Sequence, residues 1–247
     1  MNPAELIQST VRIPRVGIAE GTTPVISFGD YTTAKIATIG INPSIREFKT
    51  SKGQLFPINK KRLIDHESLG IRSIQRYNKD QAEQIWQGCK DYFNGPNAYW
   101  PWFIHLEDLL QHLGTSYKSN ATHLDITPWA TDPVWSKLDK KSGIKLLEAN
   151  ISNLNHQILD SRIRTILFNG RQVYNHINQH LNWHLQKVEE LKYTAGGKKQ
   201  TSDLILGDGP MGRSVVGWTI NLQSAKLTKS ERERLVNTLK QFIKSNS

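Results

Sequence analysis

The sequence predicts an α/β protein with a mostly parallel sheet covered by helices on both faces. Short β-rich runs alternate with longer segments of helical periodicity, and polar loops follow the runs. Strands separated by helices require crossover connections, which place helices against both faces of the sheet. No repeat or Pro/Ser-rich linker divides the 247 residues. We therefore expect one domain over residues 1–247, with residues 1–21 as an N-terminal arm or short helix.

Two β-rich runs predict strands in the first part of the chain. Residues 24–28 end at a Gly-Asp turn signal, and residues 35–39 end at Gly40. The stretch that follows, residues 42–56, has the irregular composition of a loop. Beyond it, periodicity predicts helices over residues 60–69, 81–93 and 102–113, and then a short strand over residues 123–126.

The second part of the chain repeats this alternation. A long helix is expected over residues 144–159, and Thr228 and Glu231 have the spacing of a capping box at the start of the last helix. The remaining predicted elements are a strand over residues 164–168, a helix over 171–181, a hairpin within 187–206, a strand over 215–220 and a helix over 230–243.

Charge and cysteine content narrow the function classes. Lysine and arginine exceed aspartate and glutamate by 32 − 22 = +10, which makes a polyanion such as nucleic acid the first partner to consider. No apolar stretch approaches the length of a membrane span, and the N-terminus has no secretory signal, so we expect no membrane partner. The single cysteine, Cys89, excludes an internal disulfide and a cluster held by several thiolates. A reducing cytoplasm fits these features.

Ligands of open parallel sheets lie beyond the carboxyl ends of the strands. The segments that follow the four predicted strands of this kind are residues 40–44 (GINPS), 125–129 (DITPW), 169–171 (NGR) and 221–224 (NLQS).

These segments, in this order, resemble the uracil-DNA glycosylase superfamily over roughly residues 36–243. Residues 40–44 resemble the first catalytic motif of its mismatch-specific branch, which ends in Gly where this chain has Ser44. Other resembling segments are residues 53–56 (GQLF), where related branches supply a base-stacking Phe, residues 124–127 (LDIT), where most members carry a pyrimidine-reading Asn, residues 167–170 (LFNG), and residues 221–225 (NLQSA), where the second catalytic motif usually begins with His or Asn.

The resemblance implies a three-layer αβα sandwich with a central, mostly parallel four-stranded sheet, plus a small β-hairpin. It implies a monomeric, cytoplasmic bacterial enzyme that binds DNA, flips a base and cleaves its N-glycosidic bond without a metal or organic cofactor. By position, the catalytic residues would be Asn42 and Asn221, the base-binding residues Ile41, Ser44, Phe56 and Asp125, and the DNA-binding residues Gln223, Ser224, Lys226 and Arg171.

The chemistry of two of these residues suits glycosidic hydrolysis, with a plainer alternative for each. The Asn42 amide can orient a water toward C1′, although it is no general base; alternatively it forms an Asx-turn before Pro43. Phe56 would stack on the flipped base, which is worth about 1–3 kcal/mol; alternatively it packs in the core.

Asp125 is the most informative departure from the superfamily. A carboxylate only accepts hydrogen bonds, and the N4 amine of cytosine is the group that requires an acceptor. The small Ser44 leaves room for a substituent at C5 of the base. We therefore expect a modified cytosine as substrate, such as glucosylated 5-hydroxymethylcytosine of phage DNA. The alternative is a structural Asp125 that pairs with Arg171 or caps a turn.

Several features remain open at this stage. Asn221 or Gln223 would donate to the departing base, Ser224 would hold a phosphate, and Leu222 or Leu227 would wedge into the duplex. His176, His180 and His184, spaced four apart, could line one helix face and are expected to be solvated or half-buried rather than metal ligands. Packing is the expected role of the tryptophans at 100, 102 and 129. The lysines at 198 and 199 fit either phosphate contact or an ordinary exposed turn.

Three functions compete on this evidence. The first is a monofunctional glycosylase for a modified cytosine. The second is a uracil or mismatch-repair glycosylase. The third is a non-catalytic DNA-binding module with the same fold, because residues 221–225 are a degenerate form of the second motif.

Overall fold

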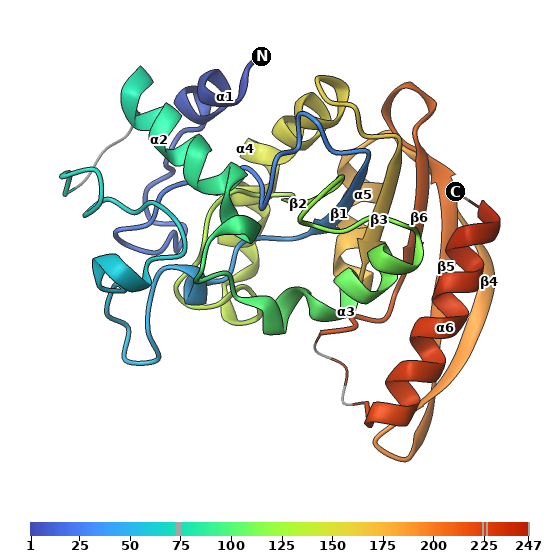
Figure 1. Ribbon diagram of the computed structural model, residues 1–247. Coiled ribbons are helices and arrows are strands. Elements are labelled where there is room, and N and C mark those ends of the chain that lie inside the picture. The colour runs from blue at the N-terminus through green and yellow to red at the C-terminus, as the bar shows by residue number, and fades with distance from the viewer. Residues whose placement is uncertain (73–75, 224, 226, 247) are drawn as a thin grey trace.

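A computed structural model describes residues 1–72, 76–223, 225 and 227–246 of the chain. Its centre is a six-stranded sheet with the order β2-β1-β3-β6-β5-β4 (Figure 1). The first four strands in that order are parallel, and β5 and β4 continue the sheet as an antiparallel hairpin. The strands are β1 (Ile36–Gly40), β2 (Ala121–Asp125), β3 (Thr165–Asn169), β4 (His184–Ala195), β5 (Lys198–Asp208) and β6 (Ser214–Trp218).

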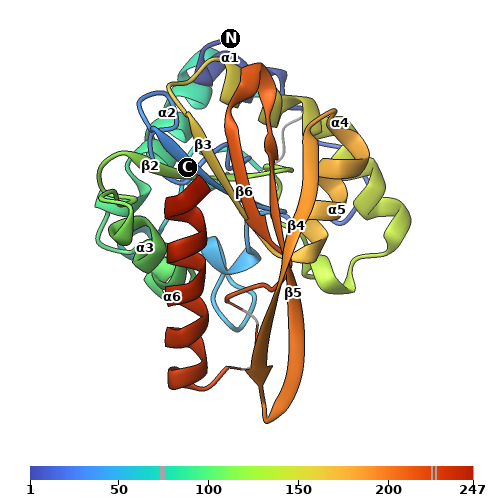
Figure 2. The same ribbon diagram turned by 90° about the vertical axis from the view of Figure 1, so that its right-hand side faces the viewer.

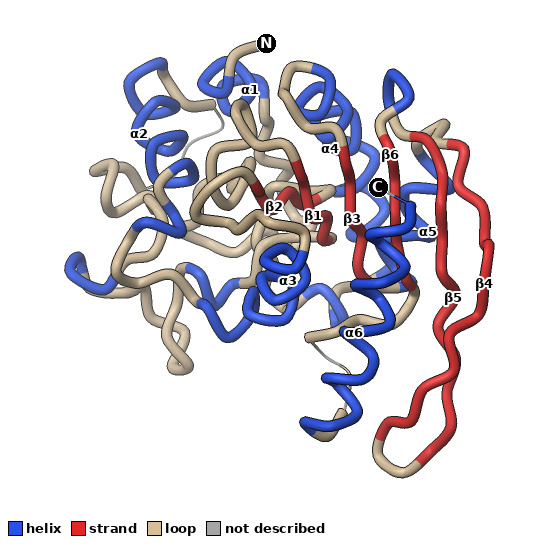
Figure 3. Tube along the Cα trace, turned by 45° about the vertical axis from the view of Figure 1, so that its right-hand side comes forward, coloured by secondary structure: helices blue, strands red, loops and turns tan. Residues whose placement is uncertain are grey.

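Helices cover both faces of this sheet. Figures 2 and 3 show α3 and α6 on one face and α4 and α5 on the other. The helices are α1 (Pro3–Ser9), α2 (Lys79–Lys90), α3 (Trp100–His112), α4 (Lys140–Leu159), α5 (Arg171–His180) and α6 (Lys229–Asn246). The predicted αβα sandwich is confirmed, with one refinement: the hairpin is not a separate element but widens the sheet from four strands to six.

The parallel strands consist largely of small and apolar residues because both of their faces are covered. All five residues of β2 are buried, as are the centres of β1 and β3. In the register, Gly40 lies beside Asp125, and Asn169 lies beside Trp218. The four parallel strands therefore end at one edge, called here the carboxyl edge.

Two predicted elements are wrong. Residues 24–28 form no regular strand, because only Phe28 makes a β-bridge, to His123. Residues 60–69 form turns and bends in place of a helix, directly after a short 3-10 turn at Ile58–Lys60. There the Asp65 carboxylate accepts from the backbone N–H of Ser68 at 2.7 Å and from Lys61 at 2.7 Å, which favours a local turn over helical hydrogen bonding.

The other helices agree with prediction to within a few residues. The capping box at α6 is present: the Thr228 N–H donates to Glu231 Oε2 at 2.7 Å, and the Glu231 N–H donates to Thr228 Oγ1 at 3.3 Å. Over the described ranges, no helix has both the length and the apolar character that a membrane crossing requires.

Candidate active site at the carboxyl edge

A cavity of about 630 Å³ opens at the carboxyl edge, where the polar loops of four parallel strands meet. Seven of the predicted site residues line it: Ile41, Asn42, Ser44, Asp125, Arg171, Asn221 and Gln223. Asn169, Thr131 and Thr219 add polar groups, and Trp102 and Trp135 add aromatic surface. Loops distant in sequence therefore share one pocket of the size that encloses a small organic ligand.

Three predicted residues are not part of this set. Ser224 and Lys226 lie outside the described residues. Phe56 is not brought to the cavity: its backbone N–H donates to the Phe48 carbonyl at 3.1 Å, and the Arg62 guanidinium lies 4.8 Å from its ring centroid. The loop over residues 49–55 folds back on itself through a bridge between Lys49 and Leu55, which carries Phe56 away from the sheet edge.

Tryptophan supplies the aromatic surface of the cavity in place of Phe56. Trp129 is fully buried and Trp100 packs at 5.3 Å from Phe93, so packing is the role of both, as predicted. Packing is the wrong interpretation for Trp102, which lines the cavity with 40% of its surface exposed. Trp135 was not expected in the site at all.

The Asn42 side chain is oriented by its neighbours. Its Nδ2 donates to the Pro43 carbonyl at 3.0 Å and the Trp129 carbonyl at 3.3 Å, and lies 3.4 Å from Thr131 Oγ1. Carbonyl oxygens only accept, so these contacts fix which end of the amide is nitrogen. The acceptor Oδ1 is the end that these contacts leave available.

A buried relay of polar groups holds Asp125. Its Oδ1 lies 3.4 Å from Nε2 of His123, whose Nδ1 lies 2.7 Å from Thr38 Oγ1. That hydroxyl in turn lies 2.6 Å from the hydroxyl of Tyr117. The side chains of Asp125 and His123 are only 4% and 5% exposed. A Cβ at Gly40 would collide with both of them, so glycine at this strand end provides the space that they occupy.

The directions of these hydrogen bonds follow from the carboxylate. A carboxylate only accepts, so Nε2 of His123 faces Asp125 Oδ1 as an N–H; in the neutral ring, Nδ1 then accepts from the Thr38 hydroxyl. Thr38 Oγ1 then accepts from Tyr117. Burial raises the pKa of Tyr117 well above its ordinary value, which keeps its hydroxyl a donor. The relay thus occupies Oδ1 of Asp125 and leaves Oδ2 for a ligand.

On the opposite side of the cavity, Asn169 organises the turn after β6. Its Oδ1 accepts from the Trp218 indole at 2.8 Å and from the Leu222 N–H at 3.0 Å, while its Nδ2 donates to Gln223 Oε1. The Gln223 amide nitrogen is thereby left as the donor end of that side chain. Asn221 Oδ1 accepts from the Gln223 N–H at 3.1 Å in an Asx-turn.

Several sequence alternatives are decided by these contacts. Arg171 pairs with Asp203 at 3.4 Å and not with Asp125. Leu222 is fully buried, so it cannot be the wedge; Leu227 is partly buried against the core. The Ser44 hydroxyl caps a 3-10 turn by accepting from the Arg46 N–H at 3.1 Å.

Burial shifts the pKa of two side chains that do not line the cavity, Glu47 and His176. Glu47 is the last residue of the 3-10 turn after β1 and is buried. Burial raises its pKa to about 7, although the hydrogen bond from Tyr92 at 2.6 Å and the charge of Arg62 at 3.9 Å favour the ionised form. His176 packs edge-on at 6.4 Å from Trp135, and burial lowers its pKa. Among the described residues, no group of three His, Cys, Asp or Glu side chains has the arrangement of a metal site.

No protein-family model matches the sequence, and no curated protein matches it. Function must therefore be inferred from the residues of the cavity.

Proposed function

We propose that the protein is a monofunctional DNA glycosylase that excises a cytosine-type base, with 5-modified cytosine such as glucosylated 5-hydroxymethylcytosine as its substrate class. One observation carries the proposal. Asn42, Asp125 and Asn221 lie at or just after the ends of three different strands and yet line a single cavity at the carboxyl edge. A flipped nucleotide needs one pocket in which its sugar and its base are held at the same time.

Hydrolysis of the N-glycosidic bond requires an oriented water. The bond between C1′ and the base nitrogen breaks with its electron pair on the base, water adds to C1′, and the proton that water loses ends on the base or in solvent. Asn42 Oδ1 accepts a hydrogen bond from that water, because its Nδ2 is occupied by carbonyl groups. Donor amides on the β3–β6 side, such as the nitrogen of Gln223, stabilise the charge of the departing base.

Asp125 reads the base in this proposal. With Oδ1 facing His123, Oδ2 accepts from the N4 amine of cytosine. The O4 of uracil would meet the same oxygen as an acceptor against an acceptor, which is repulsive. A carboxylate held in one orientation by a buried relay therefore favours cytosine over uracil.

Cavity size and surface support a modified base over a bare one. Pockets of about 300–1,000 Å³ hold ligands considerably larger than a single pyrimidine ring, and this cavity of about 630 Å³ lies within that range. Trp102 offers an exposed indole on which a base or a sugar substituent can stack. Ser44, which lines the same cavity, has a small side chain and so leaves room for such a substituent.

The test is base release from oligonucleotides that carry cytosine, 5-hydroxymethylcytosine, its glucosylated form or uracil, followed by alkali to cleave abasic sites. We expect cleavage of a modified-cytosine strand after alkali only, and none with Asn42→Ala protein that still binds the strand. Release of uracil alone would favour a repair glycosylase. Binding without release from any strand would favour the non-catalytic module.

A further inference from the structure

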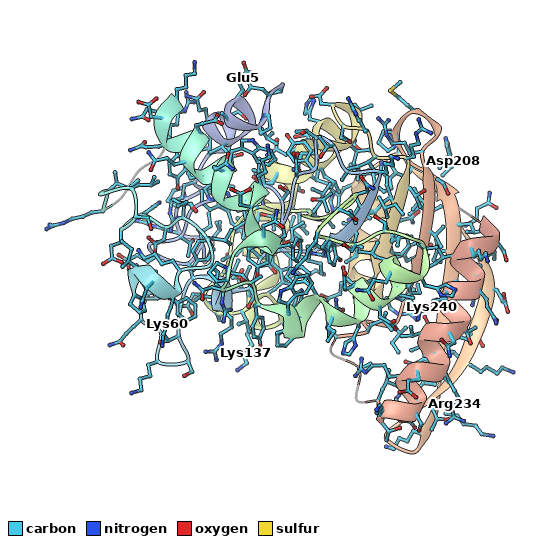
Figure 4. The ribbon with its side chains drawn as sticks, in the orientation of Figure 1. Glu5, Lys60, Lys137, Asp208, Arg234 and Lys240 are labelled. Atoms are coloured by element: carbon cyan, nitrogen blue, oxygen red, sulfur yellow. The ribbon has the colours of Figure 1, made fainter. Side chains whose placement is uncertain are left out.

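The hairpin of β4 and β5 extends well past the carboxyl edge. The last residue of β6, Trp218, pairs with Leu204, and the next residues, Thr219 and Ile220, still hydrogen-bond to Asp203 and Ser202. The four residues Lys198–Thr201 of β5 continue beyond that point with β4 alone. At about 3.4 Å per residue, this arm reaches about 14 Å past those last contacts. Figure 4 places Asp208 at the opposite end of β5 and Arg234, near the start of α6, toward the arm.

One face of the arm is partly buried, and the other is exposed to solvent. Leu191 and Tyr193 are partly buried against the core, on the face where α6 lies beside the hairpin (Figure 2). Side chains alternate along a strand, so residues 190, 192 and 194 point to the other face. Their cross-strand partners there are residues 203, 201 and 199. The outer four residues of this open face, Lys192, Thr194, Lys199 and Thr201, are all exposed.

Charge is sorted along the open face. At its root, Asp203 pairs with Lys187 at 2.6 Å and with Arg171, and Glu190 lies 3.4 Å from Lys187. Both acids are thus neutralised close to the cavity. Farther out, Lys192 and Lys199 form no ion pair with any carboxylate in the described part of the chain.

The spacing of the outer residues suits a phosphate backbone. Lys192 lies opposite Thr201 and Lys199 opposite Thr194, so the two lysines are diagonal neighbours about 7–8 Å apart at the strands. Lysine ammonium groups and threonine hydroxyls are common donors to phosphate oxygens. Arg171 joins this strip to the cavity, because it lines the cavity and pairs with Asp203 at the root of the arm.

We propose that the open face of the arm, formed by Lys192, Thr194, Lys199 and Thr201, binds the sugar–phosphate backbone of a nucleic acid whose target nucleotide occupies the cavity. The position of the target nucleotide rests on the proposed function. The contact between the arm and the nucleic-acid backbone does not rest on the proposed function. Contacts to phosphate oxygens carry no sequence information, so the arm's contribution to affinity is expected to be independent of sequence.

The experiment measures the affinity of the full-length protein for short fluorescent DNA, duplex and single-stranded, that contains no releasable base, over a series of salt concentrations. Each neutralised phosphate contributes about 0.9 to the slope of log affinity against log salt on duplex DNA. The double variant Lys192→Ala/Lys199→Ala is therefore expected to lower that slope by about 1.8. The matched control is Lys35→Ala/Lys79→Ala, which removes the same charge from exposed sites away from the arm.

The control variant is expected to keep the wild-type slope. A slope lowered equally in both double variants, or in neither, overturns the proposal, because only net charge or no lysine of the arm would then matter. Base release by the wild-type protein is measured separately. If the arm variant lowers the slope but the wild-type protein releases no base, the arm binds nucleic acid and the glycosylase proposal is rejected. If base is released but the arm variant keeps the wild-type slope, the glycosylase proposal stands and the arm proposal is rejected.

Discussion

On the β1–β2 side of the cavity, Asp125 and Asn42 are held by partners from the interior, whereas the β3–β6 side combines the buried Asn169 with side chains that reach solvent. Asp125 is 4% exposed and ends a relay through the interior, and Asn42 is fixed by backbone carbonyls. Arg171, by contrast, is 59% exposed, and Asn169 and Gln223 bond to each other across a turn. A buried, fully paired group holds one geometry, so the first side suits recognition and water placement. In the proposed glycosylase, the second side would face the departing base and the DNA backbone.

Loss of Asn42 should have the largest effect. In the proposed glycosylase, Asn42→Ala removes the acceptor assigned to the attacking water while the cavity remains. We therefore expect base release to slow about 1,000-fold, a part of the 7–11 kcal/mol that positioning can contribute. Single-turnover release and DNA anisotropy, measured together, separate chemistry from binding. A variant that loses affinity and activity in equal proportion would place Asn42 in binding instead.

Glu47 tests whether the first side is built at a cost in stability. Burial raises its pKa from 4.5 to about 7, so between these values the folded protein keeps a proton that the unfolded chain has released. The free energy of unfolding should therefore fall as pH rises from 4.5 to 7, by an amount on the order of 3 kcal/mol from this group.

Urea unfolding across this pH range measures the effect. Glu47→Gln keeps an acceptor for Tyr92 and cannot ionise, so the part of the pH dependence due to this group should disappear. An identical pH profile in the variant would show that Glu47 does not resist ionisation in the folded protein.

Asp125→Asn should change the preference of the β1–β2 side between cytosine and uracil without removing the side chain. An amide can both accept and donate, so uracil becomes acceptable and cytosine loses its advantage. Discrimination by one good polar pair is worth about 1–3 kcal/mol, which is roughly a five- to 150-fold change in the ratio of the two release rates. Competition between the two substrates in one reaction gives this ratio directly. A ratio that does not move would remove Asp125 from base reading.

Asn169→Ala tests the second side. It leaves the Trp218 indole N–H buried without its acceptor and unfastens Leu222 and Gln223, at a cost of about 1–3 kcal/mol in stability. Asn155→Ala is a matched control. Asn155 also accepts from an indole, that of Trp183, at a distance of 3.2 Å, and neither residue lines the cavity. Both should unfold at lower urea, but only Asn169→Ala should slow base release. Equal release in the two variants would make Asn169 purely structural.

The two sides also differ in how far the sequence predicts them. The alternation of β-rich and helical patterns predicts which segments follow the parallel strands, and these segments supply most of the cavity lining. His123 could have been found as well, because residues two apart in a strand share a face with Asp125. Its partners could not, since Thr38 meets His123 only through the pairing of β1 with β2. Phe56 was misplaced for a similar reason: a loop's path depends on contacts such as Arg62 that no local pattern reveals.

The smallest expected effect comes from the far end of the relay. Tyr117 is buried and does not line the cavity, so Tyr117→Phe leaves the pocket intact but removes the donor to Thr38, which can then turn away from His123. A net loss of about 1 kcal/mol, or roughly fivefold, is expected in discrimination between cytosine and uracil. The direct readout is the ring ¹⁵N spectrum of His123, which should report Nε2–H alone in the wild type and a mixture in the variant.

Tyr77→Phe is the matched control for this change. Tyr77 also meets a histidine, with its hydroxyl 2.9 Å from His66 Nε2, but neither residue lines the cavity. The two variants should lose similar stability, and only Tyr117→Phe should alter base choice and the His123 spectrum. If both leave discrimination unchanged while the His123 spectrum shifts, the relay orders the histidine without governing Asp125, and the contrast between the two sides of the cavity is then one of packing alone.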